Sequence, residues 1–248
     1  MRTQVQSLGV PALLVLHLLP GVIATLIFVA LAAPIEAAGY PPLAAFLAAI
    51  AVGIVPFELG VLVVAGRQVA GDTELLAAVP YRRRMSLRSW LILFPALLLA
   101  AVVGFGVFAL LEAPIREGMF AWLPDWFVTP VPLDGIPDYS ASAWIVTLVA
   151  FGVLNAVVGP LVEELYFRGF LLPRMSQFSH WAPLINVVLF SLYHLWSPWQ
   201  FLSRVAGVSP FAYAVWRTQN VWLGVAVHIA LNTISVATVV ALVVSQLD

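Results

Sequence analysis

The sequence predicts an all-α membrane protein, a polytopic bundle of about seven (roughly six to eight) transmembrane helices. Of its 248 residues 62% are hydrophobic and only 9% are charged, whereas about 25% of the residues of a soluble protein carry a charge. The apolar runs have the length of membrane helices rather than of barrel strands. We therefore expect a helical protein whose partners include the lipid bilayer.

The composition also excludes several kinds of function. The chain contains no cysteine, so disulfides, thiolate metal sites and a cysteine nucleophile are excluded. Its net charge is −1, which leaves no basic footprint for nucleic acid. No internal repeat is visible, and nothing in the sequence sets an oligomeric state.

Helices are predicted from the apolar runs in chain order. They cover about 10–33, 43–66, 90–111, 143–172, 181–196 and 220–246. A further apolar stretch, 199–216, is interrupted by Arg204, Gly207 and Pro210 and suits either a full or a broken span. The first run is too long for the core of a signal peptide, so we expect a retained helix.

Two loops of opposite charge predict the orientation of the chain. The basic loop 67–89 carries Arg67, Arg82, Arg83, Arg84 and Arg88. The loop 112–142 is acidic, with Asp134 among its carboxylates. The positive-inside rule then places 67–89 and the N-terminus, with Arg2, in the cytoplasm. We expect a multi-pass protein of the cell membrane, with three helices and their cytoplasmic and external loops in 1–142 and the later helices in 143–248, all in one membrane domain.

Two adjacent carboxylates, Glu163 and Glu164, lie inside an apolar helix. Inserting a carboxylate at that depth in a membrane costs roughly 2.5–3.5 kcal/mol, so two adjacent carboxylates indicate a structural or functional role. Arg168 follows Glu164 by four residues, the spacing and order of a helical ion pair. Glu163 points about 100° away around the helix and is free for chemistry. Pro160 removes one backbone hydrogen bond just before the pair and should kink the helix, which makes room for water.

Two further polar pairs lie in later helices. Phe190 and His194 share a face of the helix 181–196, and His228 and Asn232 share a face of the last helix. An antiparallel hairpin about the polar turn at 176–180 would bring Glu163 and His194 to similar depth. A carboxylate, two imidazoles and an amide that converge in a membrane are able to activate water.

The predicted roles follow from this chemistry. Glu163 would be the general base, and His194 would hold the attacking water or a metal that carries it. His228 and Asn232 would donate hydrogen bonds to the oxyanion of a tetrahedral intermediate. If a divalent metal such as zinc takes part, its ligands would be Glu163, His194 and His228. The short zinc-protease pattern His-Glu-x-x-His is absent, so a metal-dependent and a metal-free mechanism both stay open.

Three blocks in this order resemble those of the CAAX prenyl protease and bacteriocin-processing (CPBP, or Abi) family of intramembrane proteases. They are Glu163-Glu164-x-x-x-Arg168, Phe190-x-x-x-His194 and His228-x-x-x-Asn232, and the resemblance covers about residues 143–240. It implies an intramembrane, glutamate-dependent endopeptidase, usually labelled a metalloprotease, whose site comprises Glu163, His194, His228 and Asn232. Glu164, Arg168 and Phe190 would support that site, and residues 143–248 would form the catalytic core.

The resemblance also suggests substrates. Eukaryotic relatives cleave prenylated C-termini, and some bacterial relatives are linked to bacteriocin maturation or self-immunity. We expect a peptide or protein substrate that enters from the membrane or the cytoplasmic side. The lysine-free, alanine- and arginine-rich composition suggests a GC-rich bacterial gene, which weakens the prenylated alternative.

Other interpretations of the polar residues stay open. A non-proteolytic scaffold or immunity protein on the same fold is one alternative. A proton-coupled transporter is a weaker one, because the chain lacks a repeat. We expect structural or solvated roles for His17 and His180. Glu58, beside Pro56, either lines a cavity or packs within the bundle, and we do not include it in the site.

Overall fold

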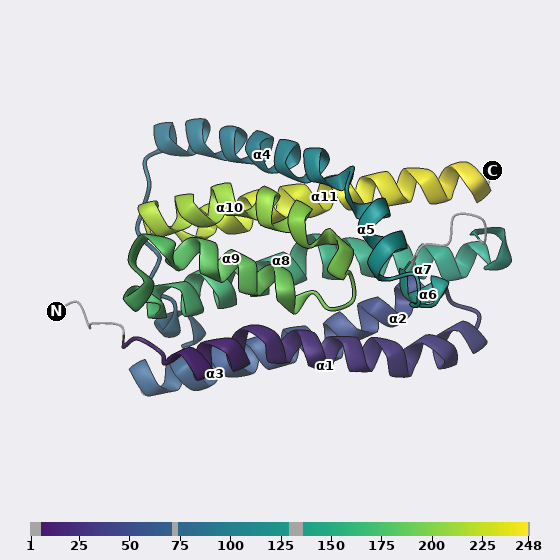
Figure 1. Ribbon diagram of the computed structural model, residues 1–248, viewed down its shortest axis with the longest axis horizontal. Helices are drawn as coiled ribbons and strands as arrows, with labels where there is room; N and C mark the ends of the chain where they lie inside the picture. Colours follow the sequence, from purple (N-terminus) through teal and green to yellow (C-terminus); the bar gives the residue numbers. More distant parts are fainter. Residues whose placement is uncertain (1–5, 71–73, 129–135, 248) are drawn as a thin grey trace.

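The protein is a bundle of long helices that run side by side (Figure 1). A computed structural model describes residues 6–70, 74–128 and 136–247, so Arg2 and Asp134, which entered the prediction of orientation, lie outside the described residues. Within the described residues, five helical stretches are long and apolar enough to cross a membrane. The prediction of an all-α polytopic membrane protein is confirmed.

The five candidate spans match predicted helices. They are α1 (Val10–Ala37), the run α2 (Pro42–Ala49)–η1 (Ile50–Ile54)–α3 (Val55–Ala70), α4 (Leu87–Ala109), the run Ala141–Arg174, and α11 (Val221–Leu247). The run Ala141–Arg174 consists of α7 (Ala141–Phe151), η4 (Gly152–Val158), α8 (Gly159–Glu163), η5 (Glu164–Leu171) and η6 (Leu172–Arg174). In this run η4 and η5 are π-helical, with turns wider than those of an α-helix.

A helical hairpin packs inside the bundle and is not among the candidate spans. It comprises α9 (Ala182–Tyr193), the short helix η8 (Pro198–Gln200) and α10 (Phe201–Thr218). In Figure 1 the connection between α9 and α10 lies partway along the bundle, whereas α1 and α11 continue past it. The stretch predicted at 199–216 is therefore one continuous helix that accommodates Pro210 and packs against α9 and α4.

The acidic segment predicted as a loop at 112–142 contains short helices, so that part of the prediction is wrong. These are α5 (Glu112–Met119), α6 (Asp125–Val128) and η3 (Ile136–Asp138). The aromatic side chains of α6 explain the difference, because Trp126 and Phe127 pack against the buried ring of Phe28 in α1. The basic loop holds one 3-10 turn, η2 (Leu75–Ala78), and η7 (Ser176–Trp181) forms the turn before α9.

One end of the bundle gathers the basic loop and the turn between α10 and α11. The backbone N–H of Arg83 donates to the carbonyl of Gln219, and the Asn220 amide donates to the carbonyl of Arg83. Arg174 donates to the carbonyl of Ala78 at the same end. This clustering of arginines agrees with the charge pattern used above, and the cytoplasmic orientation stays a prediction.

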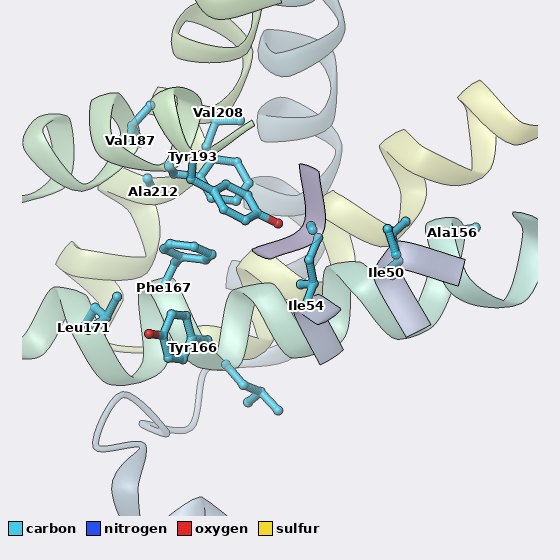
Figure 2. Packing of buried hydrophobic residues seen from close by; sticks show 14 of the residues in the cluster. Ile50, Ile54, Ala156, Tyr166, Phe167, Leu171, Val187, Tyr193, Val208 and Ala212 are labelled. Carbon is cyan, nitrogen blue, oxygen red and sulfur yellow. The ribbon is translucent and has the colours of Figure 1, made fainter. Parts of the chain in front are cut away.

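Aromatic and aliphatic side chains from three parts of the chain form the core around the later helices. Figure 2 shows Phe167 from η5, Tyr193 from α9 and Ile54 from η1 lying together. The Tyr193 ring lies 5.1 Å from that of Phe167. The end of α9 is therefore held from several sides.

A close approach of two backbones also fixes the end of α9. A Cβ atom on Gly21 of α1 would lie 1.9 Å from the carbonyl oxygen of Tyr193, so only glycine fits there. Gly60 of α3 has open space around it and serves as a matched control.

We expect Gly21→Ala to destabilise the protein by about 1–3 kcal/mol, because the added methyl group pushes α1 away from α9. Gly60→Ala should instead be neutral or stabilising by up to about 1 kcal/mol, since alanine is the better helix former. Thermal unfolding in detergent micelles measures both. Equal effects of the two substitutions would contradict the close contact.

Candidate active site

A buried carboxylate, Glu164, joins two helices at the centre of the candidate site. Its Oε1 atom lies 3.1 Å from Nη1 of Arg168 and 3.1 Å from Nδ1 of His228 on α11. The predicted pairing of Glu164 with Arg168 is present, and both side chains are fully buried. Gly224 makes room for this carboxylate, because a Cβ atom there would lie 2.5 Å from its other oxygen.

The guanidinium of Arg168 rests on aromatic rings as well as on Glu164. Its central carbon lies 4.0 Å from the centroid of the Phe190 ring, with Phe167 and Phe211 at 5.9 Å and 5.7 Å. The contact with Glu164 is an ion pair that is not aligned as a hydrogen bond. The three guanidinium nitrogens have no hydrogen-bond partner among the described residues. The faces of the rings therefore supply part of its stabilisation.

Phe190 also positions His194 through its backbone. The carbonyl oxygen of Phe190 lies 2.7 Å from Nδ1 of His194. A carbonyl only accepts, so Nδ1 carries the proton and Nε2 of the neutral imidazole is left as an acceptor. His194 was predicted on the helix 181–196, but α9 ends at Tyr193 and His194 is the residue just past that end. The four-residue spacing between Phe190 and His194 still brings the two together, because the carbonyls in the last turn of a helix have no partner within the helix and are free to accept from a nearby side chain.

Glu163 does not pair with Arg168; its partners are Tyr193 and His228. The hydroxyl of Tyr193 donates to its Oε1 atom at 2.5 Å. Its Oε2 atom lies 3.8 Å from Nε2 of His228. Because Nδ1 of His228 faces Glu164, the one imidazole stands between the two carboxylates. The sequence prediction missed Tyr193, for which the only signal was a phenol directly before His194.

Asn232 lies one turn beyond His228 on α11 and reaches across to the run Ala141–Arg174. Its amide nitrogen donates to the carbonyl of Asn155 at 2.8 Å. Asn155 lies in the wide turns of η4, shortly before Pro160. The sequence predicted a kink at Pro160; the structure shows π-helical turns on either side of α8, which contains Pro160. One carbonyl of these turns is used to hold Asn232.

A cavity of about 650 Å³ brings the predicted residues together. Glu163, His194, His228 and Asn232 all line it. Glu164 and Arg168 do not line it, and Glu164 contacts His228 from outside the cavity. The supporting role of these two residues stays a prediction. Most of the other lining side chains are aromatic or aliphatic, so the polar groups converge in apolar surroundings.

The structure also shows the surroundings of His17 and Glu58, two polar residues that were not included in the predicted site. His17 is structural, because Nδ1 faces the carbonyl of Leu13 and Nε2 pairs with the amide of Asn186. Glu58 of α3 is fully buried, and neither carboxylate oxygen has a hydrogen-bond partner among the described residues. It lies within electrostatic reach of Glu163 and Arg168. Glu58 therefore packs within the bundle behind the cavity rather than lining it.

The donor atoms do not fit the metal site that the sequence left open. No group of three or more His, Asp or Glu side chains in the described part of the chain is arranged to hold a metal ion. One nitrogen of His194 faces the Phe190 carbonyl, and one nitrogen of His228 faces Glu164. Metal-bound histidines are held in the same way, so the misfit lies in the relative placement of the side chains and not in these contacts. We therefore derive no step through a metal, and the zinc ligand set stays a prediction from the resemblance.

Comparison with known proteins identifies the region that carries the polar residues of this cavity. Residues 144–234 match the family model described as "Type II CAAX prenyl endopeptidase Rce1-like". This region is a CPBP-family domain. All three predicted blocks fall within the matched residues of the CPBP domain.

A curated relative supports the same assignment. Over 83 residues, the chain is 28% identical to a protein of Bacillus subtilis (strain 168) named "Putative membrane peptidase YdiL". The match covers 33% of this chain and 34% of that relative, so the chain spans about a third of the relative's length. No solved structure matches the chain.

Breaking the central ion pair should unfold the CPBP domain more readily. Arg168→Met leaves the buried Glu164 without its cation, and we expect a loss of about 3–5 kcal/mol of stability. The double variant Arg168→Met, Glu164→Gln removes both charges and should recover most of that loss. Thermal unfolding in micelles measures the three proteins. Additive losses in the double variant would show that the two charges do not depend on each other.

Proposed function

We propose that the protein is an intramembrane endopeptidase in which Glu163 activates water to hydrolyse a peptide bond. The observation that carries this proposal is the convergence of Glu163, His194, His228 and Asn232 on one cavity within a membrane-embedded bundle. The family match and the name of the curated relative support peptidase activity.

Glu163 acts as the general base. Its Oε2 atom takes one proton from water, while Tyr193 holds Oε1 and fixes the plane of the carboxylate. Nε2 of His194 accepts a hydrogen bond from the other O–H of that water, which keeps its proton, and so orients the oxygen. The resulting hydroxide oxygen bonds to the carbonyl carbon of the substrate. Glu163 then returns its proton to the leaving nitrogen as the C–N bond breaks.

Two donors stabilise the oxyanion that forms on the substrate carbonyl. His228, with both nitrogens protonated, keeps Nδ1–H on Glu164 and presents Nε2–H to the cavity. Asn232 uses one amide hydrogen on Asn155 and has a second for the oxyanion. Such preorganised donors lower the barrier because they need no rearrangement when charge develops.

The substrate is a membrane-associated peptide or protein that enters from the membrane or from the cytoplasmic side. A CAAX-like C-terminus or a bacteriocin-type leader are the two classes that the family suggests. We place the protein in the cell membrane with its N-terminus in the cytoplasm, on the charge pattern of its loops.

Replacing the base tests the mechanism. Glu163→Gln keeps the shape of the side chain but removes its basicity, so cleavage should fall by roughly 100-fold or more. The assay is mass spectrometry of a panel of hydrophobic and prenylated CAAX-type peptides incubated with purified protein in micelles. Unchanged thermal stability would show that the variant is folded.

The control is Glu36→Gln, an exposed carboxylate on α1, which should keep full activity. Full activity of Glu163→Gln would overturn the role of Glu163. A wild-type protein that cleaves none of the peptides would contradict the endopeptidase proposal. Those results would favour the scaffold or transporter alternatives.

The metal question has its own measurement. Because the described donors do not form a ligand group, we expect cleavage to persist when the protein is dialysed against EDTA, with no zinc in the active sample. Metal analysis by mass spectrometry checks the sample before and after dialysis. Loss of activity that returns with zinc alone would contradict the metal-free mechanism.

A further inference from the structure

A second buried arginine, Arg204, lines the cavity together with Glu163. It lies on α10 and is 7% exposed. The mechanism above does not use it, and none of the three sequence blocks contains it. A buried arginine is costly in a bundle of this kind, which raises the question of what it binds.

Side chains around Arg204 hold its guanidinium in place. Nη2 donates to Ser197 Oγ at 2.8 Å and to Gln200 Oε1 at 2.9 Å. The Gln200 amide donates in turn to Glu112 of α5, which fixes the amide with its oxygen toward Arg204. Ser203 donates to the other oxygen of the same carboxylate at 2.5 Å. Both hydrogens of Nη2 are thereby used.

The other terminal nitrogen of Arg204 has no partner. Nη1 is buried and makes no hydrogen bond to any described residue. None of the ion pairs within 4.0 Å in the described part of the chain involves Arg204. Glu163 and Glu112 exert an electrostatic influence on it from farther away. A water molecule would satisfy a donor but would not neutralise the charge.

We propose that Arg204 binds a carboxylate of the peptide substrate, namely its free C-terminus. This inference rests on the endopeptidase function proposed above. A carboxylate accepts well from the free Nη1 donor and neutralises the guanidinium in apolar surroundings. Because Arg204 and Glu163 line the same cavity, a bound C-terminus sets which peptide bond reaches the base. The protein therefore cuts a short, fixed distance from the end of its substrate.

The cavity is large enough for the end of a peptide. It has the volume of a site for a small ligand or a short peptide. Behind Gln200, Glu112 connects α5 to η8 and α10, and these contacts hold the Arg204 side chain in place. The carboxylate of a terminal Asp or Glu side chain is the other source of the same chemistry, and the experiment separates the two.

The experiment compares three forms of one peptide that the wild-type protein cleaves. The forms are the C-terminal acid, the C-terminal amide, and the amide with glutamate as its last residue. We expect the wild type to prefer the acid over the amide by roughly 10- to 100-fold in kcat/KM, the range of a charged hydrogen bond. Arg204→Gln should lower that ratio to about one, mainly by raising KM for the acid. Arg204→Lys keeps the charge and should restore part of the preference.

The ratio distinguishes recognition from a purely structural role. If Arg204 only ties α10 to the neighbouring loop, Arg204→Gln would slow cleavage of the acid and the amide equally. The control Arg217→Gln, exposed near the end of α10, should leave the ratio unchanged. A wild-type ratio near one would overturn the proposal and leave the endopeptidase function intact. If the amide that ends in glutamate is cleaved as well as the acid, Arg204 recognises a side-chain carboxylate and not the C-terminus.

A binding arm keeps the test independent of catalysis. The Glu163→Gln protein retains Arg204, and microscale thermophoresis measures its affinity for the acid and the amide. Tighter binding of the acid, lost in the double variant Glu163→Gln, Arg204→Gln, supports the subsite. Should the wild type cleave no peptide at all, the same measurement on wild type and Arg204→Gln still decides it.

Discussion

The arrangement of the later helices depends on one buried charge, the carboxylate of Glu164. Inside the bundle a lone carboxylate is expensive, and it is tolerated here because Arg168 and His228 both meet the same oxygen. These partners come from η5 and α11, so satisfying the charge fixes the register of those two segments. Arg168 in turn stacks on Phe190, whose carbonyl positions His194. The placement of both imidazoles of the candidate site thus follows from one electrostatic requirement.

The widened backbone around Pro160 serves the same arrangement. The π-helical turns η4 and η5 lie on either side of the short helix α8, which ends at Glu163. Such turns rotate side chains away from the regular helical positions and disturb the local ladder of hydrogen bonds. One consequence is visible at Asn155, whose carbonyl accepts from Asn232 of another helix. Irregular backbone at membrane depth is acceptable where protein groups satisfy it.

Contacts between residues four apart were readable from the sequence, and contacts between helices were not. Glu164 with Arg168 and Phe190 with His194 follow from the helical period, so both were predictable. Tyr193 on Glu163 and the orphaned donor of Arg204 depend on how α9 and α10 pack, which no local pattern reveals. The end of α9 at Tyr193 is equally a tertiary effect, since the apolar run continues beyond it. The short helices α5 and α6 were missed because their partners lie in other parts of the chain: Gln200 and Ser203 for α5, and the Phe28 ring for α6.

The apolar lining of the cavity has a consequence for turnover. The proposed hydrolysis would convert one uncharged amide into an ammonium and a carboxylate, each of which is far better solvated by water than by rings such as Phe28, Phe105 and Phe151. Under the proposed function, the fragment carrying the new carboxylate would be repelled by Glu163 and by the apolar lining. The other fragment would keep the C-terminus that Arg204 is proposed to bind, so the two products would leave the cavity for different reasons.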